Sequence, residues 1–283
     1  MPASAKTSLV SAAHELRRLI PPSVARAYVN RRVDQLMEID AYRELQEAQM
    51  RHLLEFTDRA PEIPVLARQF AIETMLKTHL RWHPRLVTSE PVRGIEWLTT
   101  QRDPSRSVVL NFMHHYRYEG MFKALKRRGV ELDIIAHAEL MGKDTPNPLK
   151  HHMRLVASGG RMTPAGGGMD SYIAMARPGI TMVVASDLPG HTPVTFLGRR
   201  VMGSFGSARI ATETNSQVVL ITAHKDDDES TYLQLHPPIE PSDFADAHAL
   251  LAEILNRHGE AVLAWPEVVD MPLSRFGRIE EQA

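Results

Sequence analysis

The spacing of hydrophobic and polar positions predicts helices over the first part of the chain. Apolar residues recur at steps of three and four over positions 9–20, which predicts a short amphipathic helix that ends at Pro21 and Pro22. The pattern resumes at Ser23, a candidate N-cap, continues with a break to about residue 56, and returns over 63–82. We therefore expect a helical part at 1–90.

From residue 107 onward, short β-rich runs alternate with helical stretches. Five runs have the length and composition of buried strands, at 108–112, 132–137, 181–186, 218–224 and 232–235. A further helix is expected from Asp243 to Arg257, with Gly259 after its end. This alternation is typical of an α/β fold with a mixed, largely parallel central sheet flanked by helices. We predict a single domain over 1–283, with its α/β core at 91–276.

Composition and charge narrow the class of protein. The net charge is −1, so no overall basic excess is available to bind nucleic acid. The chain has no cysteine, which excludes disulfides and thiolate chemistry and fits a cytoplasmic location. No apolar run approaches the roughly 20 residues that cross a bilayer, and positions 1–20 do not have the charge order of a signal peptide. A peripheral location on the inner face of the cell membrane stays open.

Candidate chemistry follows the strand predicted at 108–112. His114 lies just beyond the carboxyl end of that strand, where side chains of an α/β sheet line the ligand crevice. Glu119 comes five residues later, near the first turn of the next helix, from which a carboxylate can orient the imidazole and stabilise its protonated form. The spacing alone also fits an ordinary strand-end histidine followed by a solvated acid.

Ordered blocks of the sequence resemble a known family. Residues 109–114, Val-Leu-Asn-Phe-Met-His, with Glu119 resemble the His-x4-Asp/Glu block of the lipid A biosynthesis acyltransferases. This family includes the phosphatidylinositol mannoside acyltransferases and lies within the lysophospholipid acyltransferase superfamily. Its other blocks are similar, in the same order, to residues 92–98, 147–161, 179–187, 194–198 and 206–211, and its ending to Pro266-Glu267 and Arg275-Phe276.

The resemblance implies a glycerol-3-phosphate acyltransferase-like fold and a fatty acyltransferase. The acyl group would pass from a thioester of coenzyme A or of an acyl carrier protein to a hydroxyl or amine of a lipid or glycolipid. It implies that His114 is the general base and Glu119 its partner, and that Arg154, Arg161 and Asp187 bind substrate. No metal and no cofactor beyond the thioester co-substrate are expected. For Arg154 a surface salt bridge, and for Asp187 a turn position, are the alternatives.

Two departures from the family pattern bear on the acceptor. The family's second acidic block is usually Asp-Gln-Asp, whereas this chain has Ser186-Asp187-Leu188, so one acid matches. The membrane-spanning N-terminal helix common in the lipid A members has no counterpart in the sequence. The alternative function is therefore a cytoplasmic tailoring acyltransferase that acts on a soluble sugar, amine or peptide natural product. The amphipathic positions 9–20 fit either a helix on a membrane surface or a packed one.

Other function classes find less support. The chain has no Gly-x-Ser-x-Gly sequence, which a serine hydrolase of the α/β-hydrolase type would carry. The chain has fourteen histidines but no His-Glu-x-x-His spacing for a metal. A non-catalytic lipid-binding protein stays open.

Three further segments allow two interpretations each. Glycines 166–168 form a flexible turn or bring backbone amides to an anion. Residues 196–201 line an acyl path or form an edge strand with a basic turn. The basic side chains of Lys123, Lys126, Arg127 and Arg128 dock an acidic carrier protein or form a solvated helix face.

Overall fold

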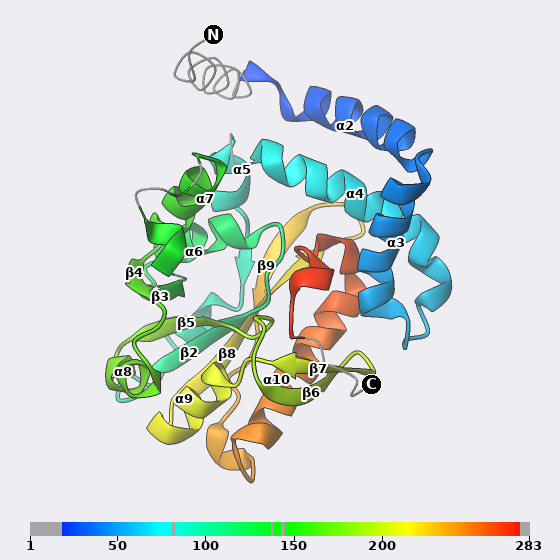
Figure 1. Cartoon of the computed structure of the whole chain (residues 1–283). Coiled ribbons are helices and arrows are strands. Elements are labelled where there is room, and N and C mark those ends of the chain that lie inside the picture. Colours follow the sequence, from blue (N-terminus) through cyan, green and yellow to red (C-terminus); the bar gives the residue numbers. More distant parts are fainter. Residues whose placement is uncertain (1–18, 81–82, 137, 143–144, 146, 278–283) are drawn as a thin grey trace.

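The computed structural model describes residues 19–80, 83–136, 138–142, 145 and 147–277, and its N-terminal part is helical (Figure 1). The helices are α2 (Pro22–Met37), α3 (Asp40–Leu54), α4 (Ile63–Leu80) and α5 (Pro84–Thr88). The predicted break lies between α2 and α3. The helix predicted at 9–20 lies almost entirely outside the described residues, as does the predicted end of α4 at Trp82.

Helix α2 lies on the outside of α4 at one edge of the molecule (Figure 1). Its buried residues Val29 and Val33 pack with Ala71, Ile72 and Leu76 of α4 in a small separate core. The prediction of Ser23 as the N-cap is wrong, because the helix already begins at Pro22. Proline suits this position since its fixed φ is helical and its missing amide would have no partner there.

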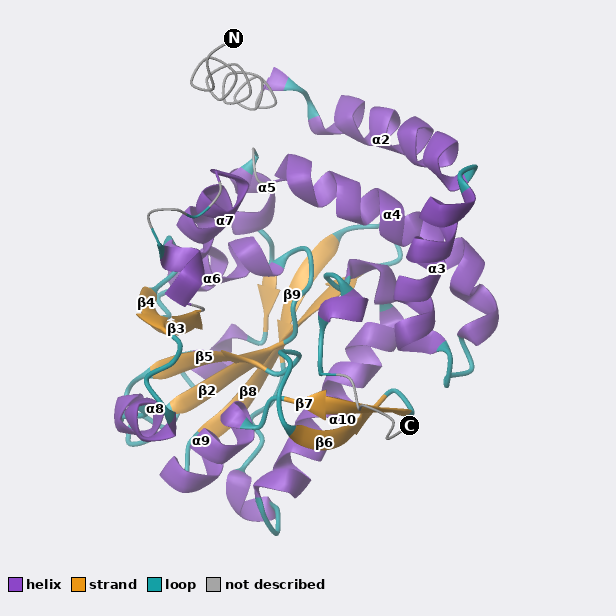
Figure 2. Ribbon diagram, in the orientation of Figure 1, coloured by secondary structure: helices purple, strands orange, loops and turns teal. Residues whose placement is uncertain are grey.

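A seven-stranded sheet forms the centre of the molecule (Figure 2). Its order is β1-β9-β8-β2-β5-β3-β4, and its neighbouring strands are parallel except for the antiparallel pair β8–β9. The predicted mixed, largely parallel sheet flanked by helices is thus confirmed. The strands are β1 (Val92–Arg93), β2 (Val108–Phe112), β3 (Leu132–Ala136), β4 (Arg161–Pro164), β5 (Thr181–Ala185), β8 (Gln217–Lys225) and β9 (Thr231–Leu235).

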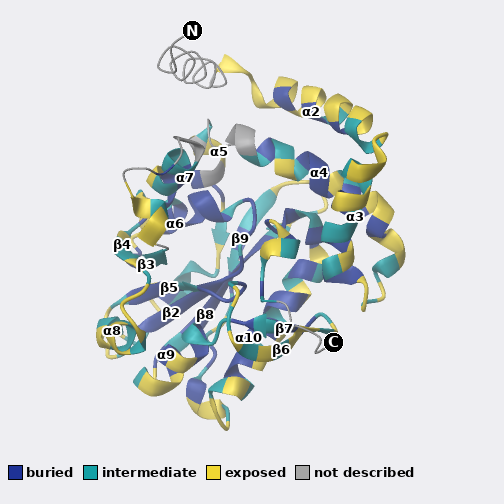
Figure 3. Ribbon diagram, in the orientation of Figure 1, coloured by how far each residue is buried: buried dark blue, intermediate teal, exposed yellow. Residues whose placement is uncertain are grey.

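The five predicted strands are β2, β3, β5, β8 and β9. The edge strands β1 and β4 were not predicted, because they are short and lack the buried apolar run that marks the inner strands. All five residues of β2 are buried, as expected for a central strand covered by helices on both faces (Figure 3).

The described helices after β2 are α6 (Tyr118–Lys126), α7 (Asn147–Ala157), α8 (Met169–Met175), α9 (Gly206–Thr214) and α10 (Ala247–Ala264). Short 3-10 turns are η2 (Ala60–Glu62), η3 (Ile95–Leu98), η4 (Ala138–Met141), η5 (Pro241–Asp243), η6 (Pro266–Val268) and η7 (Pro272–Ser274). Among the described residues, no helix is long and apolar enough to cross a bilayer. Helices run to Thr88 and the first strand starts at Val92; that the whole chain is one domain stays a prediction.

Helix α10 packs on β8. It also contacts an antiparallel hairpin formed by β6 (Thr192–Phe196) and β7 (Arg199–Gly203). The prediction that this helix ends before Gly259 is wrong, because α10 continues to Ala264. A Cβ at Gly259 would lie 3.1 Å from Leu197 Cδ2, so the glycine lets the hairpin approach the helix closely. Residues 196–201 end β6, turn at Leu197 and Gly198 and begin β7; they are not among the residues that line the larger cavity, and Arg199, predicted in a solvated turn, instead donates to the carbonyl oxygen of His52.

Candidate active site

The imidazole of His114 and the carboxylate of Asp187 meet at the carboxyl edge of the sheet. His114 follows β2 and Asp187 follows β5, and these parallel neighbours run in register up to Phe112 and Ala185. His114 Nδ1 lies 2.7 Å from Asp187 Oδ1, and the backbone amide of His114 donates to Oδ2 at 2.8 Å. One carboxylate therefore holds both the ring and the backbone of His114.

Asp187 is ionised although it is fully buried. Burial raises the pKa of Asp187, but a positive charge on His114, the hydrogen bonds from His114 and the nearby charge of Arg275 together lower it to about 2. Because an ionised carboxylate only accepts hydrogen bonds, the His114 ring, whenever it is neutral, carries its proton on Nδ1. The lone pair then lies on Nε2, which is the atom able to take a proton from a substrate.

His114 lines a cavity of about 490 Å³, within the size range of small-molecule sites. Polar groups in its wall include Tyr118, His152, His191 and Arg209. Most of the wall is apolar and comes from β2, β3, β5 and the helices around them: Phe112, Phe122, Ile134, Ile135, Met153, Val156, Met169, Val184, Ala185, Leu188 and Ile210.

The carboxylate of Glu119 lies in the first turn of α6 and is buried beside a second histidine. Its Oε1 is 3.3 Å from His152 Nδ1 and 3.9 Å from Lys77 Nζ. His152 Nε2 in turn shares a hydrogen bond of 3.1 Å with the Tyr118 hydroxyl. Two histidine–carboxylate pairs thus border one cavity, and the pairing of His114 with Glu119 stays a prediction.

The structure places the two predicted arginines differently. Arg154 is exposed on α7, whose residues His152, Met153 and Val156 line the cavity. Arg161 begins β4, at the opposite end of the strands from His114, and its Nε donates to Asp133 Oδ1 at 2.8 Å. The structure therefore brings His114 and Asp187 together but does not bring Arg161 to the cavity.

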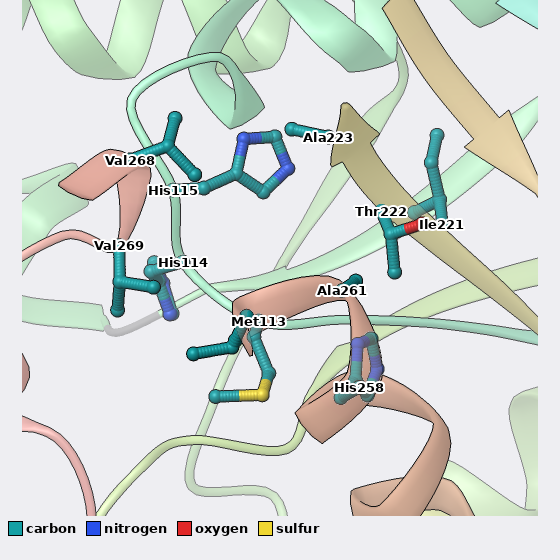
Figure 4. Close-up of a pocket in the computed structure, with 11 residues that line it drawn as sticks. Met113, His114, His115, Ile221, Thr222, Ala223, His258, Ala261, Val268 and Val269 are labelled. Atoms are coloured by element: carbon teal, nitrogen blue, oxygen red, sulfur yellow. The ribbon is translucent and has the colours of Figure 1, made fainter. Parts of the chain in front are cut away.

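A second cavity of about 20 Å³ lies behind His114 and has room for one water molecule (Figure 4). The rings of His114, His115 and His258 and the side chain of Thr222 border it. Burial lowers the pKa of His115 to about 3 and that of His258 to about 4, so both rings are neutral at pH 7. No local sequence pattern marks His258, because its partner Asn111 is 147 positions away.

Residues from distant parts of the chain complete the surroundings of His114 and Asp187. The backbone amide of Asp270 donates to the carbonyl oxygen of His114, and that of Phe276 to the carbonyl oxygen of Asp187, both at 2.9 Å. Lys77 Nζ lies 2.7 Å from Asp270 Oδ1. The described residues contain no group of three or more side chains that could hold a metal ion.

Comparison with known proteins places the chain in a family. Residues 65–276, most of the chain, match the model of the bacterial lipid A biosynthesis acyltransferases. No curated protein sequence matches. Among solved structures, the 1-acyl-sn-glycerophosphate acyltransferase of Thermotoga maritima is similar, with 16% sequence identity and a TM-score of 0.41, over 86% of this chain and 98% of that one.

Proposed function

The chain belongs to the bacterial lipid A biosynthesis acyltransferases, and we propose that it moves a fatty acyl group from an acyl thioester to a hydroxyl or amine of a lipid or glycolipid. Acyltransferase activity follows from the family; the donor, the acceptor and the residue roles are proposals. The observation that carries them is the His114–Asp187 pair at the wall of a largely apolar cavity.

In the proposed reaction, His114 Nε2 takes the proton of the acceptor group as this attacks the thioester carbonyl carbon. A tetrahedral intermediate forms, its carbon–sulfur bond breaks, and the imidazolium returns the proton to the thiolate. Because a thiol has a pKa near ~8.5, the thiolate leaves readily and the main task of the enzyme is to activate the acceptor. Charge on Asp187 stabilises the imidazolium while it exists.

We assign the orientation of His114 to Asp187, on the basis of the 2.7 Å contact at Nδ1. Glu119, which the sequence predicted for this role, acts in our proposal on His152, whose ring it contacts. The His152–Tyr118 hydrogen bond then fixes the Tyr118 ring, which meets the His114 ring edge-on with centroids 4.8 Å apart. Both acids thus support the same wall of the cavity.

The acyl chain would occupy the apolar part of the cavity, and the thioester carrier would lie at its mouth. Arg154, exposed beside cavity-lining residues of α7, is our candidate for the phosphate of coenzyme A or of an acyl carrier protein. A role of Arg161 in substrate binding has less support, because Arg161 is paired with Asp133. Arg127 and Arg128, just after α6, donate to the backbone oxygens of Thr88 and Glu90, which supports a role in packing the end of α5 and the segment after it.

A lipid acceptor at a membrane surface has one supporting feature. Val24 and Tyr28, four residues apart on α2, are 55% and 67% exposed, and Ile20, two residues before the helix begins, is 40% exposed. Such a group of exposed apolar side chains can lie in a lipid interface, which favours a peripheral membrane location over the alternative of a soluble acceptor. Serine at all three positions should reduce co-sedimentation with anionic vesicles; unchanged binding would favour the soluble acceptor.

The activity test uses a panel of fatty acyl-coenzyme A and acyl carrier protein thioesters with lysophospholipid, glycolipid, sugar and amine acceptors. Thiol release can be read directly with a thiol reagent, because the chain itself contains no cysteine. We expect thiol release that depends on the acceptor and is lost in His114→Ala. The control variant His224→Gln changes a residue outside both cavities and should keep the activity. Wild-type protein inactive across the panel, or His114→Ala as active as wild type, would contradict the proposed function.

A further inference from the structure

Charges of alternating sign connect the two acids of the site. From Glu119 they run through Lys77 and Asp270 to Arg275 and Asp187, and so to His114. Lys77 Nζ is 3.9 Å from Glu119 Oε1 and 2.7 Å from Asp270 Oδ1. Arg275 Nη2 is 2.8 Å from Asp270 Oδ2, and its Nε is 3.6 Å from Asp187 Oδ2.

The members of this row are withdrawn from solvent. Asp187 is fully buried, the side chain of Asp270 is 7% exposed, and those of Lys77 and Arg275 are 13% and 15% exposed. Charges in such surroundings are weakly screened, and each needs a partner of opposite sign. The row therefore acts as one electrostatic unit, in which removal of any one charge changes the electrostatic potential at Asp187.

Arg275 is fixed in place by more than its charge. Its Nε also donates to the backbone oxygen of Asp270 at 2.8 Å, which sets the plane of the guanidinium. The segment that carries it also binds the carbonyl oxygens of His114 and Asp187 through the amides of Asp270 and Phe276. A side chain so placed keeps a constant position relative to the His114–Asp187 pair.

A permanent cation beside Asp187 solves a specific chemical problem. His114 can accept a proton only in its neutral form, and a fully buried carboxyl next to a neutral ring tends to hold a proton. A protonated Asp187 would donate to Nδ1 and move the ring proton to Nε2, which removes the lone pair that must accept the substrate proton. Arginine stays charged at all working pH values and can prevent this.

We propose that Arg275 is a positioning residue: its guanidinium, between Asp187 and Asp270, keeps Asp187 ionised and thereby keeps the lone pair of neutral His114 on Nε2. This inference rests on the proposed function, since it assigns His114 as the base. Asp270 and Lys77 belong to the same arrangement. The negative charge of Asp270 partly offsets the positive charge of Arg275, and the positive charge of Lys77 offsets that of Asp270.

Steady-state kinetics over a range of pH test the inference, since the acid limb of kcat reports proton binding to the His114–Asp187 pair. The titratable and charged groups around Asp187 are His114, His115, His258, Asp270 and Arg275. Arg275→Gln removes a positive charge and should move the acid limb to higher pH, with kcat lower by roughly 10- to 100-fold and KM little changed. Asp270→Asn removes a negative charge and should move the limb to lower pH.

Two controls separate this role from simple stabilisation. Arg275→Lys keeps the charge but not the planar contact, so it should leave the acid limb near its wild-type position. Arg106→Gln removes an arginine of similar burial, paired with Glu240 at 2.7 Å at the opposite edge of the sheet, and should change neither kcat nor the limb. Shifts in the same direction for Arg275→Gln and Asp270→Asn, or no shift in either, would overturn the inference.

A spectroscopic measurement tests the same inference without turnover. The 15N chemical shifts of the His114 ring report which nitrogen carries the proton. For the neutral ring we expect the Nδ1–H form in the wild type and a substantial Nε2–H fraction in Arg275→Gln; the same tautomer in both would overturn the inference. Failure of the wild type to transfer any acyl group would count against the proposed function alone.

Discussion

Asn111, in the middle of the fully buried strand β2, joins α10 to the segment that carries Asp187. Its Oδ1 accepts hydrogen bonds from His258 Nε2 and from Ser186 Oγ, both at 2.8 Å. Ser186 immediately precedes Asp187, so a polar cluster inside the core helps to fix the carboxylate that holds His114.

Replacement of Asn111 by leucine should destabilise the protein and weaken this alignment. Each buried donor left without a partner costs about 1 to 3 kcal/mol, and both Ser186 and His258 would lose theirs. Urea unfolding measures the loss. Adding Ser186→Ala to the variant removes one orphaned donor and should recover part of the stability; a single variant as stable as wild type would contradict this role of Asn111.

Asp187→Asn should reduce kcat more than Glu119→Gln does. The asparagine can turn its NH2 group toward Nδ1 and so favour the tautomer with the proton on Nε2, for which we expect a loss of roughly 100-fold or more. Glu119→Gln keeps the shape beside His152 but removes a charge, and its effect should be smaller. Purified variants with matched thermal stability are compared in the thiol-release assay. The reverse order of effects would assign the partner role to Glu119.

Stability should decline as the pH falls below about 6.5. The pKa is about 3 for His115 and about 4 for both His236 and His258, all depressed by burial from 6.5. Below pH 6.5 these histidines bind protons in the unfolded chain but not in the folded protein. The free energy of unfolding is therefore highest above pH 6.5 and falls from there toward pH 4.

His258 alone should account for about 3 kcal/mol of this loss, from its shift of 6.5 to about 4. In His258→Gln the amide can still donate to Asn111 but does not titrate. Urea unfolding at several pH values should therefore give a shallower decline for this variant than for the wild type. Parallel curves would show that His258 does not stay neutral in the folded protein.

Ile135→Trp should shift the preference toward shorter acyl chains. Ile135 lines the cavity from β3, two strands from β2 and thus roughly 10 Å across the sheet from the strand that leads to His114. A larger ring there should raise KM for a sixteen-carbon thioester and leave an eight-carbon one nearly unchanged. An equal change in KM for both would mean that the chain does not extend toward β3.

Local pattern was enough to predict β2 and the position of His114 after it, because both depend on a continuous apolar run and its end. Asp187 was predicted to bind substrate, but its contact with His114 Nδ1 depends on the register between β2 and β5, which periodicity does not encode. Lys77 and Asp270 carried no signal at all: a lysine on an amphipathic helix and an acid in a loop are ordinary until tertiary packing buries them together. The end of α10 was misjudged for the same reason, since Gly259 serves a contact with the hairpin.

Because His114 and Asp187 are 73 positions apart and meet only when β5 lies beside β2, the reactive centre is absent from any partly folded chain. Parallel pairing of distant segments is slow compared with helix formation. During refolding from urea, helical signal should thus return before catalytic turnover, and the lag between them would time the docking of these two strands.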